Sequence, residues 1–173
     1  MTAPPPKFCS NCGSRLIGKF IERRERQFCK ECDRPVYQNP KPCAGVVVAD
    51  DSRVLLVQRT QPPAVSAWSI PAGYLEADES PRKAATRELR EETSLGVAYD
   101  SISIFDTAFI RHPNGNYVLV LVYMTSRGAT TGEPVPGSDA GDAWFWRLNM
   151  LDEAGEQVEL GYRSLLKKAI ETG

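Results

Sequence analysis

Short apolar runs separated by turn residues dominate the chain after its first forty residues. The runs at 43–50 ("CAGVVVAD") and 54–60 ("VLLVQRT") predict two strands joined by a short turn. The runs at 101–111 and 117–126 predict a further pair, and the Asn-Gly signal between them predicts a hairpin. One more strand is indicated by "AWFWRL" at 143–148.

Two segments have the apolar spacing of helices. In "SPRKAATRELREET", Ser80 is placed as the N-cap and Pro81 as the first helical residue, and apolar Ala85 and Leu89 lie four positions apart. From about Leu160, "LGYRSLLKKAIE" repeats apolar residues at helical spacing. Strands interleaved with two helices predict an α/β or α+β sandwich.

No apolar run approaches the roughly 18 residues that a membrane-spanning helix needs. The start, "MTAPPPKF", contains no apolar signal region, and its prolines predict a loose, extended leader. We therefore expect a cytoplasmic protein that does not associate with a membrane.

The net charge of -1 is divided unevenly along the chain. Residues 1–42 hold nine Lys/Arg against four Asp/Glu, and residues 43–173 hold twelve against eighteen, so +5 and -6 sum to -1. This split suggests two modules. We favour the view that the basic surface solubilises a small module, and RNA binding is kept as an unfavoured alternative.

Four cysteines form two C-x-x-C pairs, Cys9 with Cys12 and Cys29 with Cys32, with sixteen residues between the pairs. This spacing is typical of a zinc ribbon, in which four thiolates surround Zn²⁺ as a tetrahedron. Disulfides are disfavoured because no secretory signal is present. Four protein ligands leave no open position, so the zinc should be structural. Cys43 lies outside the spacing and is expected to be a small buried hydrophobe.

Three acids share one face of the predicted helix, because Glu88, Glu91 and Glu92 stand at i, i+3 and i+4. Their mutual repulsion costs a few tenths of a kcal/mol per pair, roughly, and some cation should offset it. Mg²⁺ or Mn²⁺, which take oxygen ligands, would do so. The alternative is an ordinary solvated helix, in which Arg87 pairs with Glu91 at i, i+4.

The run from 73 to 95 resembles the Nudix box, G-x5-E-x7-R-E-U-x-E-E-x-G-U with U aliphatic. The matching residues are Gly73, Glu79, Arg87, Glu88, Leu89, Glu91, Glu92 and Leu95. Ser94 replaces the second glycine. If this position is left-handed at the helix end, serine costs about 1 kcal/mol relative to glycine. The alternative is that the helix runs on toward Gly96. With its cysteine pairs, "YQNPKP" and "AWSIPAGYLE", the chain resembles the zinc-ribbon branch of Nudix hydrolases.

The resemblance implies a zinc ribbon at 1–38 and, at 39–173, a Nudix-type α/β/α sandwich with a mixed sheet. It also implies Mg²⁺- or Mn²⁺-dependent hydrolysis of a nucleoside diphosphate derivative. NADH pyrophosphatases carry a downstream "SQPWPFPxS" signature that this sequence lacks, so ADP-ribose or FAD-like substrates are favoured. NADH hydrolysis, decapping of RNA and a non-catalytic nucleotide sensor stay as alternatives. Relatives are often dimers, so a homodimer is a further alternative.

The resemblance also implies roles for the residues of the box. Glu88 and Glu92 should be the main ligands of the catalytic metal, with Glu91 as a further ligand or the base that activates water. The carbonyl of Ala72 or Gly73 would complete the coordination sphere. Arg87 and Glu79 would pair and fix the helix against its loop.

Residues outside the box could contact the substrate or the metals. Asp139 and Asp142 are the candidates for a carboxylate from a distant loop, with Glu133 behind them. Arg59 could contact a phosphate. Trp68 and Tyr74 could stack on a base, the alternative being a place in the core. The single histidine, His112, is expected at an exposed loop tip.

Overall fold

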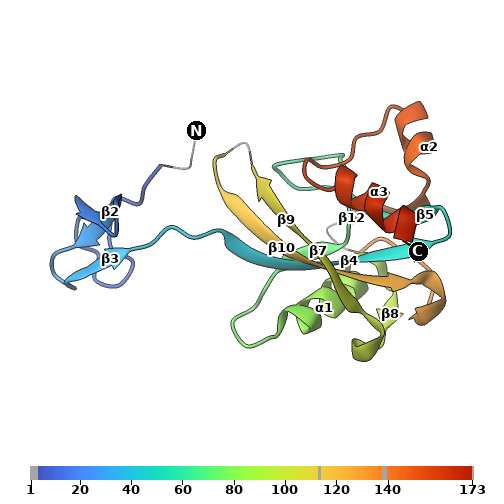
Figure 1. Cartoon of the computed structure of the whole chain (residues 1–173), viewed down its shortest axis with the longest axis horizontal. Coiled ribbons are helices and arrows are strands. Elements are labelled where there is room, and N and C mark those ends of the chain that lie inside the picture. Colours follow the sequence, from blue (N-terminus) through green and yellow to red (C-terminus); the bar gives the residue numbers. More distant parts are fainter. Residues whose placement is uncertain (1–3, 113, 138–139, 173) are drawn as a thin grey trace. The chain divides into compact units, whose positions relative to one another are not determined.

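The computed structural model describes residues 4–112, 114–137 and 140–172 (Figure 1). They form two compact units: one contains residues 4–40 and 114–116, and the other contains the rest. The chain passes from the first unit to the second after residue 40, whereas the sequence analysis expected the boundary after residue 38. No helix within the described ranges is long and apolar enough to cross a membrane.

The N-terminal unit is a three-stranded antiparallel sheet in the order β1 (Ile17–Ile21), β2 (Arg24–Cys29) and β3 (Arg34–Val36). The turn between β1 and β2 has positive φ at both central residues, 51° at Glu22 and 63° at Arg23. Such a turn matches the twist of a hairpin. The buried apolar cluster of this unit is small and includes two of the paired cysteines. A core of that size needs a metal or other cross-link to be stable.

The larger unit is built on a mixed sheet in the order β12-β5-β4-β10-β9. Strands β4 and β10 are parallel, and the other neighbours on this path are antiparallel. Two short strands extend the sheet, since β6 pairs with β5 and β7 pairs with β4. The bounds are β4 Lys41–Asp50, β5 Arg53–Arg59, β6 Trp68–Ser69, β7 Ala72–Tyr74, β9 Ser103–Arg111, β10 Tyr117–Ser126 and β12 Ala140–Trp146.

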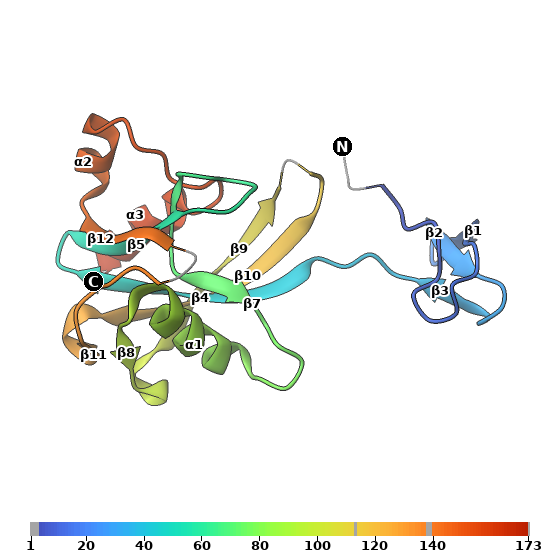
Figure 2. The same ribbon diagram turned by 180° about the vertical axis from the view of Figure 1, so that it is seen from behind.

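Helices cover both faces of this sheet, as Figures 1 and 2 show from opposite sides. Helix α1 (Pro81–Thr93) packs on one face, where it meets Val46 and Val48 of β4. Helices α2 (Leu148–Glu153) and α3 (Arg163–Thr172) pack on the other face, where Val47 points. A strand buried on both faces explains the unbroken apolar run at 44–49. The predicted α/β/α sandwich is confirmed.

Several elements differ from the sequence-based expectations. The strand expected at 143–148 ends at Trp146, and α2 follows it, because Leu148 and Leu151 turn into the core. The C-terminal helix begins at Arg163, after a loop. Six short elements in this unit were not expected: the strands β6 and β7, β8 (Gly96–Val97) paired with β11 (Thr130–Thr131), and the 3-10 turns η1 (Tyr99–Ser101) and η2 (Arg127–Ala129).

Candidate active site

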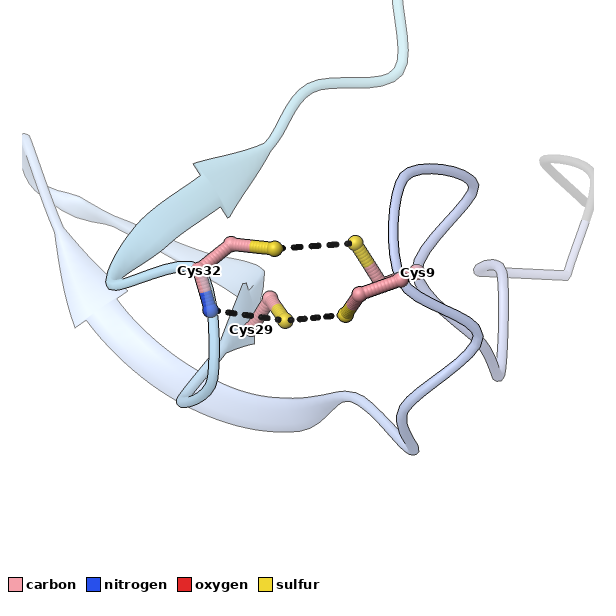
Figure 3. A group of neighbouring side chains, drawn as sticks. Cys9, Cys29 and Cys32 are labelled. Carbon is pink, nitrogen blue, oxygen red and sulfur yellow. Dashed lines mark hydrogen bonds between the residues drawn. The ribbon is translucent and has the colours of Figure 1, made fainter.

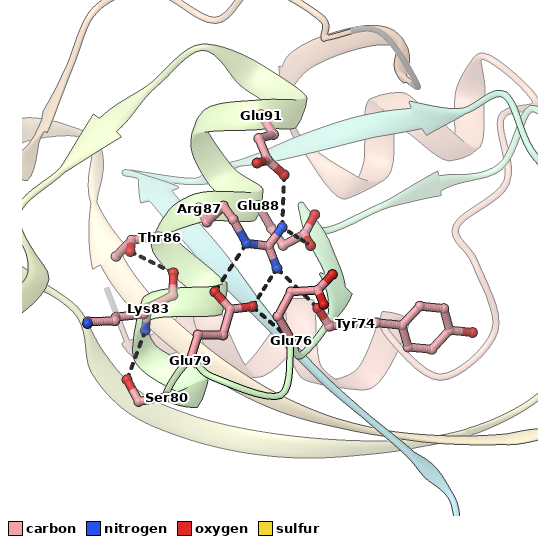
Figure 4. A network of polar contacts seen from close by, with 9 residues as sticks. All are labelled: Tyr74, Glu76, Glu79, Ser80, Lys83, Thr86, Arg87, Glu88 and Glu91. Atoms are coloured by element: carbon pink, nitrogen blue, oxygen red, sulfur yellow. Dashed lines mark hydrogen bonds and ion pairs between the residues drawn. The ribbon is translucent and has the colours of Figure 1, made fainter.

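The residues of the predicted site meet where β7 passes through a short loop into α1 (Figure 4). Pairing with β4 fixes the loop, since Gly73 lies opposite Ala44. Ser80 caps the helix by accepting a hydrogen bond from the Lys83 backbone N–H at 3.3 Å, and Pro81 follows it, as the sequence predicted. The buried residues of α1 then direct its acidic face toward the loop.

Gly73 lies directly against the Glu88 carboxyl group. A Cβ atom at position 73 would be 2.1 Å from Oε1 and 2.2 Å from Cδ of Glu88, so only glycine fits there without movement. On the preceding residue, the Ala72 N–H donates to Oε2 of Glu92 at 3.0 Å. The loop therefore holds two of the three acids in place.

Arg87 is the centre of a network that includes the remaining acid (Figure 4). Its Nε and Nη2 donate to the two carboxylate oxygens of Glu79 at 3.2 and 2.7 Å, and Nη2 also donates to the Tyr74 carbonyl at 3.1 Å. Its Nη1 donates to Glu88 at 2.6 Å and to Glu91 at 2.8 Å. The expected pairing of Arg87 with Glu79 is confirmed, and its bidentate geometry is the strong form of such a pair.

This network changes the account of the charge repulsion. The Arg87 hydrogen bonds hold the pKa of Glu79 below its usual value, and the carboxylates raise the pKa of Arg87 further. A guanidinium that contacts three carboxylates offsets their repulsion from within the chain. From the sequence, bound cations were expected to offset the repulsion, and the Arg87–Glu91 pair was the alternative. In the structure Arg87 pairs with Glu88 as well as with Glu91.

The chemistry of the acidic face suits a hard divalent cation, because its side chains offer carboxylate oxygens, which such ions prefer. Glu88 and Glu92 face the loop, whereas Glu91 is held by Arg87 and its side chain is 56% exposed. Across the described residues, the one group of three or more His, Cys, Asp or Glu with closely converging ligand atoms is the four cysteines. The carboxylates of Glu88 and Glu92 are the two of the three that lie against the loop.

Ser94 ends the helix in the left-handed conformation, with φ 60° and ψ 2°. Its N–H donates to the Arg90 carbonyl at 2.9 Å, so the helix stops at Thr93 and does not run on to Gly96. Its hydroxyl donates to the carbonyl of Val135 at 3.3 Å, a contact that glycine cannot make. The serine thus exchanges backbone strain for a hydrogen bond to a distant loop.

That loop holds the C-terminal end of α1. The N–H groups of Val135 and Gly137 donate to the carbonyls of Thr93 and Glu92, both at 2.9 Å, which satisfies acceptors that a helix end leaves unpaired. A Cβ at Gly137 would lie 1.9 Å from the Glu91 carbonyl oxygen, so this close approach requires glycine. Sequence reasoning missed Gly137, although the turn signal "VPGS" precedes the predicted strand.

A pocket beside Glu92 is lined mainly by the end of β5 and the residues that follow it, including Gln58, Arg59 and Thr60. The Arg59 Nη1 lies 3.5 Å from Oε2 of Glu159, and the Arg59 side chain is 26% exposed. Glu159 is buried, and that burial raises the pKa of its carboxyl group although Arg59 opposes the effect. Glu159 was missed because its partner lies one hundred positions away in the sequence.

The two aromatic candidates differ in their surroundings. Trp68 is 3% exposed, its ring meets Trp146 edge to face at 5.3 Å between centroids, and its Nε1 donates to Glu156 at 3.0 Å. Trp68 therefore has the core role that was its alternative, and it offers no face to a base. Tyr74 is 51% exposed, with the Lys41 ammonium 5.0 Å from its ring centroid.

The distant acids are not brought to the site by any contact of the described residues. Asp139 lies outside those residues. Asp142 is exposed on β12, and its carboxylate accepts a hydrogen bond from the Ala143 N–H at 2.7 Å. Glu133 contacts Arg127 at 3.3 Å and its side chain is 85% exposed. His112 was expected at an exposed loop tip, but it is half-buried directly after β9.

The four paired cysteines converge in the N-terminal unit (Figure 3). All four sulfur atoms lie within 4.8 Å of one another, with Sγ distances of 3.9 Å from Cys9 to Cys32 and 3.5 Å from Cys12 to Cys29. A zinc tetrahedron with Zn–S bonds of about 2.3 Å has edges of about 3.8 Å, so the group fits Zn²⁺. Cys43 is buried elsewhere, and burial raises the pKa of its thiol to about 12, as suits an inert core residue.

A family model for the NUDIX domain matches residues 39–167, which include the loop and helix just described. The chain belongs to the Nudix family. It is 27% identical over 80% of its length to the ADP-ribose pyrophosphatase of Methanocaldococcus jannaschii, of which it covers 78%. It is 31% identical over 84% of its length to the NAD-capped RNA hydrolase NudC of Pseudomonas aeruginosa, of which it spans only 49%.

Solved structures agree with this assignment of the fold. A NUDIX hydrolase from Nitrosomonas europaea superimposes with a TM-score of 0.69 at 23% identity, covering 96% of this chain and 92% of that one. The NUDIX domain of Shewanella oneidensis NrtR, solved with ADP ribose, gives a TM-score of 0.65 at 20% identity, covering 84% of this chain and 93% of that domain. The protein is thus a Nudix pyrophosphohydrolase with an N-terminal four-cysteine ribbon.

Proposed function

We propose that this protein hydrolyses the pyrophosphate bond of a nucleoside diphosphate derivative with the help of Mg²⁺ or Mn²⁺. ADP-ribose is the preferred substrate of this proposal, followed by FAD-like dinucleotides. The observation that carries it is the contact of the Glu88 and Glu92 carboxyl groups with the loop at Ala72 and Gly73. Two acidic side chains held against a glycine-bearing loop serve pyrophosphate chemistry better than they serve stability.

In this proposal Glu88 and Glu92 hold the divalent ion, with a carbonyl of the 72–73 loop as a further ligand. The bound ion would draw charge from the pyrophosphate oxygens and make water a better nucleophile. Arg87 keeps the Glu88 carboxylate correctly turned, because its Nη1 donates to that group at 2.6 Å. Glu79 in turn fixes Arg87 through two hydrogen bonds.

Glu91 and Arg59 have the positions for two further tasks. The Glu91 carboxylate accepts a hydrogen bond from Arg87 yet remains more than half exposed, so it is placed to accept a proton from the attacking water. Arg59 lines the same pocket as Glu92, and its guanidinium would contact a phosphate group of a substrate bound there. Tyr74, whose ring is exposed beside the loop, is the aromatic available for a base.

The preference for ADP-ribose is supported by the relative from M. jannaschii and by the bound ligand of the S. oneidensis domain. Hydrolysis of NAD-capped RNA is the second candidate, supported by the relatives named NudC. The four cysteines are proposed to hold a structural Zn²⁺, since a complete thiolate set leaves no position for water.

A substrate panel tests the proposal. ADP-ribose, FAD, NADH, diadenosine polyphosphates and NAD-capped RNA are each scored for kcat/KM with Mg²⁺ and with Mn²⁺. The proposal expects ADP-ribose to have the highest value. A higher value for NAD-capped RNA would select the second candidate. Binding of ADP-ribose without hydrolysis of any compound would indicate a nucleotide sensor and overturn the proposal.

A further inference from the structure

The sheet of the N-terminal unit has one face that carries its cations. In antiparallel strands, residues directly opposite each other project on the same side. Lys19 lies opposite Arg26 and Ile21 opposite Arg24, so three cations share the side on which Phe28 lies opposite Ile17. The acid within these strands, Glu25, lies opposite Phe20 on the other side.

The other face of this sheet belongs to the cysteine cluster. Cys29 and Val36 project there, by the same alternation, and both belong to the buried cluster around the paired cysteines. The cations therefore lie on the face that is turned away from the metal site. Metal binding explains the cysteine side of the sheet, and on the other side Phe28 is buried, but neither fact explains why the exposed cations Lys19 and Arg24 gather there.

Aromatic rings lie among the cations on this outer face. The Lys19 ammonium is 4.1 Å from the ring centroid of Phe28, and the Arg26 guanidinium is 4.7 Å from that of Tyr37. Tyr37 is 48% exposed, so its ring has free surface in addition to the Arg26 contact. Cation–aromatic pairs of this kind order the charged side chains without neutralising them.

The positive charge of the face is mostly uncompensated. Arg26 pairs with Glu22 of the turn at 3.1 Å, and its Nε is buried without a hydrogen-bond partner. Lys19 and Arg24 are exposed and make no ion pair within the part of the chain that the structure describes. A ligand for this face must therefore supply several negative charges.

We propose that this cation–aromatic face, defined as Lys19, Arg24, Arg26, Phe28 and Tyr37, binds single-stranded nucleic acid. A single strand offers phosphates to the cations and an unpaired base to the half-exposed Tyr37 ring, and this combination is how such strands are held without sequence preference. An acidic peptide would use the cations and leave the aromatic ring without a role. The proposal does not depend on the substrate of the hydrolase.

The size of the effect follows from the number of cations. Three phosphate contacts to a single strand give a slope of about -2 for the logarithm of affinity against the logarithm of salt concentration. Affinity should then fall about 16-fold between roughly 50 and 200 mM salt. Loss of one stacked base weakens binding about tenfold.

The experiment measures binding of a labelled oligouridine of about 12 nucleotides to the zinc-loaded full chain by fluorescence anisotropy, without Mg²⁺ so that no hydrolysis occurs. The matching DNA strand and a duplex of the same length are measured alongside. Arg24→Gln should weaken binding several-fold and make the salt slope shallower by about 0.7. Tyr37→Ala should weaken it about tenfold. Arg34→Gln is the matched control, because it removes one exposed cation of the same unit from the other face.

Four results would overturn the proposal. Equal losses for Arg24→Gln and Arg34→Gln would mean that only diffuse charge acts. Unchanged binding by Tyr37→Ala, or a duplex bound as tightly as the single strand, would show that no base stacks on Tyr37. If no oligonucleotide bound even at the lowest salt concentration, the face would not be a nucleic-acid site, and a protein partner would be the remaining ligand to test. Zinc content verifies that each variant is folded, and unchanged ADP-ribose hydrolysis separates this result from the test of the proposed function.

Discussion

Replacing Gly73 with alanine perturbs the closest contact of the proposed catalytic centre. The added Cβ would lie 2.1 Å from Oε1 of Glu88, whereas such atoms normally stay about 3.2 Å apart, so the carboxyl group or the loop must shift by about 1 Å. A misplacement of that size can reduce catalysis about 100-fold. We therefore expect kcat/KM for ADP-ribose to fall about 100-fold, with a loss of about 1–3 kcal/mol in the free energy of unfolding.

The assay combines steady-state hydrolysis at saturating Mg²⁺ with thermal unfolding. Gly128→Ala is the matched control: the Cβ it adds would have its nearest neighbour, the Ser126 Oγ, at 4.0 Å, so both activity and stability should stay at the wild-type values. Wild-type kcat/KM for Gly73→Ala, with an unchanged melting temperature, would show that the loop does not press against Glu88.

Three further predictions concern the helix and the ribbon. Because Arg87 lowers the pKa of Glu79, the stabilisation by this carboxylate is present above the unfolded value of about 4.3 and is lost as pH falls through the lower folded value. The difference in melting temperature between wild type and Glu79→Gln should thus be constant at neutral pH and shrink below pH of about 4; a difference that persists in acid would contradict this. Ser94→Gly relieves about 1 kcal/mol of left-handed strain and removes a hydrogen bond of about the same worth, so denaturant unfolding should change by less than about 0.5 kcal/mol, and a large loss would refute the exchange. Cys29→Ser should abolish zinc binding and expose the first forty residues to proteolysis, whereas a zinc-containing, resistant variant would show that the ribbon does not need this ligand.

The sequence predicted those elements whose signals are local. The run at 44–49 is apolar at every position because β4 is buried on both faces, and α1 has its cap, its proline and its buried face within fourteen residues. Helix α2 escaped prediction because six residues are too few to show a helical period. The roles of the box residues came from the resemblance, and the contact of Gly73 with Glu88 gives that glycine a physical reason.

The parts that sequence reasoning missed depend on partners far away along the chain. Gly137 must be glycine because it touches the Glu91 carbonyl, and Glu159 is buried beside Arg59, yet neither partner is near in sequence. Trp68 shows the same limit, since its neighbours decide whether the ring is exposed. The charge balance of the acids was also incomplete, because the spacing did not show that Arg87 contacts Glu79, Glu88 and Glu91 at once.

The kcat of Glu92→Gln for ADP-ribose at saturating Mg²⁺ tests the central claim most directly. The glutamine carbonyl can still accept the hydrogen bond from the Ala72 N–H, so the loop and helix keep their contact while the negative charge is lost. If Glu92 holds the catalytic cation, kcat falls by about 100-fold or more while the melting temperature stays near that of wild type. A variant that hydrolyses ADP-ribose at the wild-type rate would contradict the assignment of the catalytic centre to this loop and helix.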